Sequence, residues 1–301
     1  MSARVQPSGP PPKHFGAARA GVYAVLAIAS LFFLVPLWVT VMTSLKTMPE
    51  IRLGNIFALP AAPTLAAWGK AWSRACTGLE CTGIRVGFWN SVTILIPSVV
   101  ISILAGALTG YAMTFYKVRG AGALFAILIV GAFIPYQVFL YPLVKTLSVV
   151  SACTSISLYI SLASIILIHT IFGLPLMTLL FRNYYSALPI ELFNAARVDG
   201  AGFLTILRHV ILPMSTPIII VAVILQVTGI WNDFILGLTF ARRENQPMTV
   251  LLNNIVASTQ GEVEYNVNMA ATILTALVPL AVYLVSGRWF VRGIAAGAVK
   301  G

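Results

Sequence analysis

The sequence predicts an all-α polytopic membrane protein with about six transmembrane helices. Hydrophobic residues make up 59% of the 301 residues, whereas charged residues make up only 9%. A soluble chain carries roughly 25% charged residues, so this chain has too few charges to cover its own surface in water. The formal net charge of +11 does not indicate nucleic-acid binding, because the basic residues fall between apolar runs instead of forming a dense stripe.

Apolar runs long enough to span a bilayer, which takes about 20 residues, recur along the chain. The first run lacks the small-residue cleavage site of a signal peptide, so we expect it to remain as a helix. The fifth run contains one charged residue, Asp233. The predicted spans cover residues 20–44, 89–116, 121–144, 155–181, 214–240 and 267–287, within a transmembrane domain of residues 20–288.

An even number of spans places both termini on one side of the membrane. Basic residues favour the cytoplasmic side, and those in short loops weigh most. Lys117, Arg119, Arg288 and Arg292 lie directly against predicted span ends. We therefore expect both termini in the cytoplasm. This topology assigns residues 1–19, 182–213 and 289–301 to the cytoplasmic side, and the loops of residues 45–88 and 241–266 to the outside.

No motif in the chain predicts catalysis. The pattern G-x-x-x-x-G-K-[ST] does not occur, so the chain has no phosphate cradle for ATP hydrolysis. No Cys or His cluster has metal-ligand spacing, and we predict no catalytic residue and no metal site. Cys76 and Cys81 share one polar segment and either form a disulfide on an oxidising side or remain free thiols. His169, inside the fourth span, is either a proton relay or a hydrogen-bonded packing residue.

The loop of residues 182–213 carries signals for two short helices. Pro189 suits a first helical position, and Glu191 complements the helix dipole. The first helix is expected to end at Asp199-Gly200, where glycine can adopt the left-handed conformation. A second helix would follow and be closed by Pro213.

The first of these helices presents apolar and small side chains along much of its surface. Ala195 and Ala196 together leave a patch of low relief that another protein can approach closely. From these residues alone, the helix either docks on a partner protein or lies on the membrane surface.

A spaced set of residues in this loop resembles a motif of a known family, the EAA loop of ABC importer permeases. In that motif Glu-Ala-Ala is followed by Gly four positions after the last Ala, and then by Ile-x-Leu-Pro. This sequence has Asn194-Ala195-Ala196, then Gly200, then Leu212-Pro213. Further similar runs are Phe88-Trp89-Asn90-Ser91, Trp231-Asn232-Asp233-Phe234 and the tail Phe290-Val291-Arg292-Gly293. Nearly the whole chain resembles the carbohydrate-uptake branch, in particular the second permease subunit of maltose-type importers.

The resemblance implies a bacterial inner-membrane complex in which this chain forms half of the pore. Its implied partners are a second permease subunit, a dimer of ATPase subunits that holds ATP and Mg, an extracytoplasmic solute-binding protein and a sugar; this chain would itself bind no cofactor. The cytoplasmic tail would reach between the ATPase subunits. The residues implied to couple to the ATPase are Glu191, Asn194, Ala195, Ala196, Asp199, Gly200, Leu212 and Pro213.

Asn194 departs from the family pattern, which has Glu at this position. An amide brings no charge, so an ion pair with the ATPase is not expected here. Exposed ion pairs contribute only about 0–1 kcal/mol, so docking can rest on packing of the alanine face.

Candidates for the sugar path lie near the outer ends of the third and fifth spans. Aromatic faces suit the C–H surfaces of sugars, while amides and carboxylates suit their hydroxyls. Asp233 either makes a helix-packing hydrogen bond or lines the path. The candidates are Tyr136, Gln137, Trp231, Asn232 and Asp233.

Two further patterns concern the shape of the spans. Pro135 and Pro142 predict a kinked or broken third span. Gly106 and Gly110 form a G-x-x-x-G in the second span, which predicts close packing against another helix.

The outer segments bear on the substrate and on the outer partner. The runs Trp68-Gly69-Lys70-Ala71-Trp72 and Glu264-Tyr265-Asn266-Val267 are similar to glucose/mannose-type permeases, and the loop near Gln246 to Asn254 would face the binding protein by analogy. The expected substrate is therefore a glucose/mannose-type monosaccharide. A maltose- or trehalose-type sugar is the alternative, and an ion-coupled secondary carrier is the alternative from another class.

Overall fold

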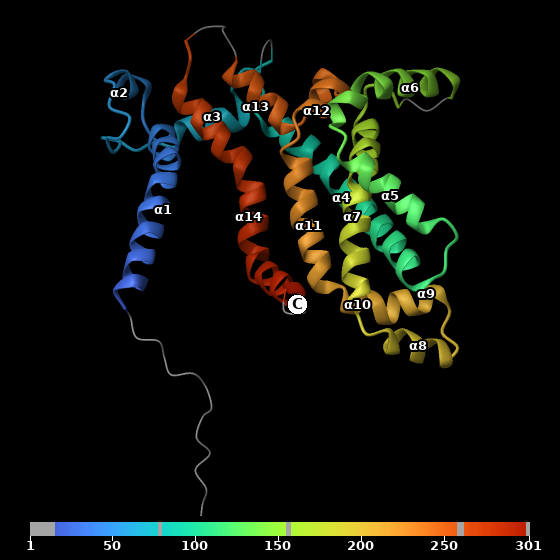
Figure 1. Ribbon diagram of the computed structural model, residues 1–301. Helices are drawn as coiled ribbons and strands as arrows, with labels where there is room; N and C mark the ends of the chain where they lie inside the picture. Colours follow the sequence, from blue (N-terminus) through green and yellow to red (C-terminus); the bar gives the residue numbers. More distant parts are fainter. Residues whose placement is uncertain (1–15, 78–79, 155–157, 258–261, 299–301) are drawn as a thin grey trace, which may run out of the picture.

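The computed structural model describes residues 16–77, 80–154, 158–257 and 262–298, and all regular structure in these ranges is helical. In this part of the chain, four helices are long and apolar enough to cross a membrane, and two bent helix pairs make six spans if each pair counts as one. The predicted all-α, six-span fold is thus confirmed. The four long helices are α1 (Ala17–Ser44), α4 (Arg85–Phe115), α7 (Leu162–Ser186) and α14 (Tyr265–Ala298) (Figure 1).

The third span is broken, as its prolines predicted. It consists of α5 (Ala121–Ala132), the short η1 (Tyr136–Phe139) and α6 (Leu140–Cys153), with a bend of 95°. Pro135 lies in the bend, where it disfavours helix at the preceding residue. Pro142 falls in the first turn of α6, where its missing N–H is tolerated. The break predicted within residues 121–144 is therefore confirmed, and the chain turns sideways at Pro135 and continues as α6 to Cys153.

The fifth span is also interrupted. The helical segment Phe203–Met214, made of α9 (Phe203–Ile206), the π-helical η2 (Leu207–Ile211) and α10 (Leu212–Met214), meets α11 (Thr216–Trp231) at 78°. The expected helix end at Pro213 was wrong, since the helix continues to Met214. In the π-helical turn just before Pro213, the N–H of Leu212 donates to the carbonyl of Leu207, and Pro213 has no N–H of its own to donate. After α11, a gap of three residues precedes α12 (Ile235–Phe240).

Close packing of α4 on α7 forms the centre of the bundle. A Cβ atom added at Gly106 would lie 2.3 Å from the Cβ of Met177, and one at Gly110 would lie 2.8 Å from the backbone nitrogen of Arg182. Because apolar side chains gain nothing by leaving lipid for each other, backbone approach at small residues is what holds such helices together. The G-x-x-x-G prediction is confirmed.

The short helices gather at the two ends of the bundle (Figure 1). At one end lie α6, α12 and three further helices: α2 (Met48–Arg52), α3 (Ala66–Ser73) and α13 (Met248–Val256). At the opposite end lie α8 (Ile190–Val198), α9 and α10, together with the first turn of α1 and the last turns of α14. The two ends of the helical chain thus share the side of α8. We call this the α8 end, and the other the α13 end.

The helix α14 extends further than the last predicted span. It continues through most of the predicted tail and ends at Ala298. The tail contains Ala295, Ala296 and Ala298, and alanine has the highest intrinsic helix propensity. The small residues of the predicted tail therefore prolong the helix.

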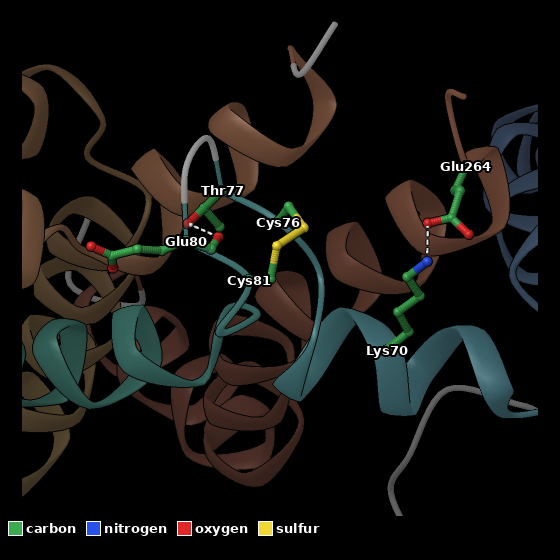
Figure 2. The surroundings of a disulfide bond; sticks show 6 residues. All are labelled: Lys70, Cys76, Thr77, Glu80, Cys81 and Glu264. Carbon is green, nitrogen blue, oxygen red and sulfur yellow. Dashed lines mark hydrogen bonds and ion pairs between the residues drawn. A yellow bond between two sulfur atoms is a disulfide. The ribbon is translucent and has the colours of Figure 1, made fainter. Parts of the chain in front are cut away.

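Covalent and ionic links tie the α13 end together. Cys76 and Cys81 form a disulfide within the loop that connects α3 to α4 (Figure 2). Of the two predicted alternatives, a disulfide or two free thiols, the structure has the disulfide. Glu80, inside the disulfide loop, lies 3.4 Å from Arg243 of η3 (Arg243–Asn245). Two other ion pairs connect the segment before α4 to the start of α14: Lys70 with Glu264 at 2.5 Å, and Arg52 with Glu262 at 2.6 Å.

Candidate functional site

The helix α8 begins and ends at the residues that the sequence indicated. Pro189 precedes the first helical residue with a φ of −61°, and Glu191 lies in the first turn. The helix ends at Asp199, and Gly200 follows with a φ of +79°. Only glycine adopts that left-handed conformation without a steric penalty. The turn lets the N–H of Ala201 donate to the carbonyl of Ala196 at 3.0 Å, which closes the helix.

An aromatic cluster holds α8 against the bundle. The ring of Phe193, which is 2% exposed, stacks on Phe115 with 4.7 Å between centroids and 18° between planes. Tyr116 packs edge-on against Phe193 at 5.7 Å and also contacts Phe203 of α9 at 5.0 Å. The hydroxyl of Tyr111 donates to the carbonyl of Phe203 at 3.2 Å. The last turn of α4 and the residue after it therefore fix both short helices.

The sequence prediction missed this cluster. The sequence did contain a signal for it. Three aromatic residues lie at the end of the second predicted span: Tyr111, Phe115 and Tyr116. Two more, Phe193 and Phe203, lie in the loop of residues 182–213. Aromatic side chains bury large areas and often pair. The pairing across about 80 positions of sequence still required the fold.

The opposite face of α8 is exposed. Leu192 and Ile190 are 45% and 47% exposed, and Asn194 and Ala195 are exposed beside them. Ala196 instead is half-buried and packs against the bundle. The expected patch of two alanines therefore has only Ala195 at its surface. This face offers apolar and small groups together with the exposed carboxylates of Glu191 and Asp199, which lie four residues before and after Ala195.

The remaining loop residues are distributed around this face. Asp199 and Gly200 are exposed at the end of α8. Leu212 is half-buried and Pro213 is exposed. Both lie on α10, which follows α8 and α9 in the chain. The eight predicted coupling residues thus share the α8 end without forming one continuous face.

Near the α13 end, the structure brings together two of the predicted path residues. The hydroxyl of Tyr136 donates to Oδ1 of Asp233 at 3.4 Å. Gln137 and Asn232 are exposed nearby in the chain. Trp231 differs: it is 2% exposed, and its indole N–H donates to the carbonyl of Thr275 in α14 at 2.9 Å.

Asp233 has a neighbour that the sequence prediction did not connect with it. His169 of α7 places Nε2 at 3.9 Å from Oδ2 of Asp233, and the two side chains are 10% and 8% exposed. These residues are the ionisable ones inside the predicted fourth and fifth spans. Ionisable groups at membrane depth tend to pair with one another, so this rule would have identified the contact. Among the residues that the structure describes, no group of three His, Cys, Asp or Glu side chains can hold a metal ion.

A polar recess opens at the α13 end. It measures about 460 Å³ and lies between α2, α3, α13 and the start of α14. Lys70, Glu262, Glu264 and Asn268 line it together with the disulfide residue Cys76. The ion pair between Lys70 and Glu264 therefore forms part of the rim of this recess.

Comparison with known proteins identifies the family to which this chain belongs. A family model for the binding-protein-dependent transport system inner membrane component matches residues 84–296. The xylose/arabinose import permease protein of Haloferax volcanii is 30% identical over 291 residues, which cover 92% of each chain. The glucose import system permease protein of Saccharolobus solfataricus is 28% identical over 288 residues, covering 93% of this chain and 95% of its own.

The fold itself has a counterpart among solved structures. A chain in the crystal structure of a bacterial ABC transporter involved in the import of the acidic polysaccharide alginate matches with a TM-score of 0.76. The match covers 94% of this chain and 100% of that chain, at 20% sequence identity. At that identity, the similarity supports a shared fold.

Proposed function

Since this chain belongs to the family of binding-protein-dependent transport system inner membrane components, we propose that it forms half of the translocation pore of an ATP-driven sugar importer. The chain is a permease subunit of the sugar ABC importer type. The observation that carries the proposal is α8, which is anchored by Phe193 and presents its other face outside the bundle.

The exposed face of α8 is the proposed contact with a separate ATPase subunit. A short helix fixed on a cluster of aromatic rings can transmit force, whereas a free helix of this length cannot keep its shape. Leu192 and Ala195 supply the packing surface, and Asn194 supplies hydrogen bonds without charge. The ATPase dimer holds ATP and Mg in this arrangement, and this chain binds neither. A second permease subunit supplies the other half of the pore.

We assign the α8 end to the cytoplasm and the α13 end to the outside. Disulfides persist in oxidising compartments, so the Cys76–Cys81 bond favours the outside for its end of the bundle. Lys117 and Arg119 follow α4 at the opposite end, where the positive-inside rule expects them. Both termini are then cytoplasmic, and the recess at the α13 end faces the solute-binding protein.

The proposed substrate is a glucose/mannose-type monosaccharide. Asn232 and Gln137 are exposed and offer amides to sugar hydroxyls, with Tyr136 as an aromatic neighbour. Asp233 accepts a hydrogen bond from Tyr136, whereas Trp231 is buried and hydrogen-bonded to α14. Relatives are named for pentoses as well as for glucose, so their names do not fix the sugar of this chain. A maltose- or trehalose-type sugar is the alternative that a substrate panel must test.

One observation favours a second candidate function, an ion-coupled secondary carrier. The buried contact between His169 and Asp233 is the kind of ionisable pair that proton-coupled carriers use. Such a carrier would run on an ion gradient without an ATPase.

Reconstitution separates the two functions. Vesicles containing this chain, the second permease, the ATPase and the binding protein should take up labelled glucose only with ATP, and vanadate should stop the uptake. Unlabelled mannose should compete, whereas maltose and trehalose should not. Uptake that follows an imposed proton or sodium gradient without the ATPase would refute the importer and support the carrier.

A further inference from the structure

Asp233 lies in the gap between α11 and α12, and its side chain is 8% exposed. An ionised carboxylate withdrawn from water is costly unless its oxygens accept hydrogen bonds. The groups that donate hydrogen bonds to this carboxylate are therefore held in place by it.

Four elements contact this one residue. Oδ2 accepts hydrogen bonds from the backbone N–H groups of Leu236 at 3.0 Å and Gly237 at 3.2 Å, which fixes the first turn of α12. As described above, Tyr136 of η1 and His169 of α7 approach the same carboxylate. The hydroxyl of Thr249 in α13 donates to the backbone carbonyl of Asp233 at 2.6 Å.

Of these four elements, three lie toward the α13 end and one, α7, is a membrane-spanning helix. The helices α12 and α13 lie at the α13 end, and η1 forms the bend of the third span. In contrast, α7 continues to Ser186 and leads through three residues into α8. Asp233 therefore lies where a displacement of the outer helices meets the helix that leads to α8.

We propose that Asp233 is a positioning residue that couples the outer helices α12 and α13 to α7, so that docking of the binding protein is transmitted toward α8. The inference rests on the proposed function, because it names how the outer partner acts on this chain. Both carboxylate oxygens are already occupied, which leaves little capacity for a sugar hydroxyl.

Two substitutions test the coupling in the assembled importer in lipid nanodiscs. Asp233→Asn keeps the shape and one acceptor oxygen but removes the charge. Thr249→Val removes the hydroxyl through which α13 donates to the backbone carbonyl of Asp233. The matched control is Thr239→Val in α12, whose hydroxyl donates only to Ile235 in its own helix at 2.8 Å.

The measured quantities are the ratio of binding-protein-stimulated to basal ATP hydrolysis, and the sugar concentration that gives half-maximal uptake. Loss of a hydrogen bond to a charged group should lower the stimulation ratio of Asp233→Asn about ten-fold. Thr249→Val should lower the ratio to an intermediate value, and Thr239→Val should match the wild type. The half-saturating sugar concentration should stay within about two-fold, because positioning does not change the sugar contacts.

Two results would overturn the inference. One is a wild-type stimulation ratio in both Asp233→Asn and Thr249→Val. The other is a large rise in the half-saturating sugar concentration with an unchanged ratio, which would make Asp233 a sugar ligand. If Asp233→Asn fails to assemble, Thr249→Val decides alone. A wild-type complex without any stimulation would instead contradict the proposed function, and this inference with it.

Discussion

Replacing Phe193 by alanine should detach α8 while leaving the membrane spans in place. The ring is 2% exposed and stacks on Phe115 at 4.7 Å. Phe→Ala in a packed site costs about 3–5 kcal/mol. The helix has only 9 residues, and isolated helices shorter than about 12–15 residues are marginal in water. Nothing intrinsic to α8 would therefore compensate for the loss.

The expected magnitude can be stated for two measurements. A loss of about 3 kcal/mol shifts the equilibrium between docked and detached α8 by more than about 100-fold. Hydrogen exchange at the backbone amides of α8 should accelerate by that factor, while exchange in α4 and α7 stays unchanged. Copurification of the ATPase with the permease pair should fall in parallel.

Two variants serve as controls for this experiment. Leu192→Ala removes a side chain that is 45% exposed, so it should leave amide protection of α8 intact even if it weakens ATPase binding. Phe193→Leu keeps an apolar side chain in the cluster and should give an intermediate exchange rate. If Phe193→Ala left both the amide protection and the ATPase yield at wild-type levels, the aromatic cluster would not be what holds α8.

Three further predictions follow from other parts of the chain. Ala195→Glu should abolish ATPase binding and uptake at normal subunit levels, because it places a long charged side chain where the exposed face of α8 has a small apolar one; wild-type uptake would contradict the docking assignment. Gly106→Val should reduce the yield of folded protein in detergent, because its Cβ would lie 2.3 Å from that of Met177, and a normal size-exclusion profile would argue against the tight contact. A maleimide reagent should label Cys76 and Cys81 in denatured protein only after reduction, and labelling without reductant would show free thiols in place of the disulfide.

The sequence was sufficient for the class of fold because the bilayer imposes a simple constraint. Every backbone polar group in lipid needs an internal partner, so long apolar runs become helices. Local signals also placed the ends of α8, since Pro189 and Gly200 act through their own backbone geometry. Where a proline interrupted a run, the sequence indicated the break but not its direction. The 95° turn at Pro135 depends on where α6 finds its packing partners.

Contacts between distant positions were beyond the sequence. His169 and Asp233 each had two interpretations in isolation, and only the packing of α7 beside the α11–α12 gap shows that they meet. Trp231 illustrates the opposite outcome. Its type suggested a sugar surface, but the fold turns it toward α14, where its N–H has a backbone acceptor. A residue's chemistry limits what it can bind, whereas its burial decides what it does bind.

The contacts around α8 also determine how its motion must spread. Phe193 ties α8 to the end of α4, and Gly106 holds α4 so close to α7 that neither helix can slide freely. The hydroxyl of Tyr184 in α7 donates to the carbonyl of Met214 at 2.7 Å, which fixes the bend before α11 to the same body. Packed interfaces of this kind resist continuous deformation. A force on α8 should therefore tilt α4, α7 and the start of α11 together, and the contacts of Asp233 with His169 of α7 and with the first turn of α12 would carry that tilt to the α13 end.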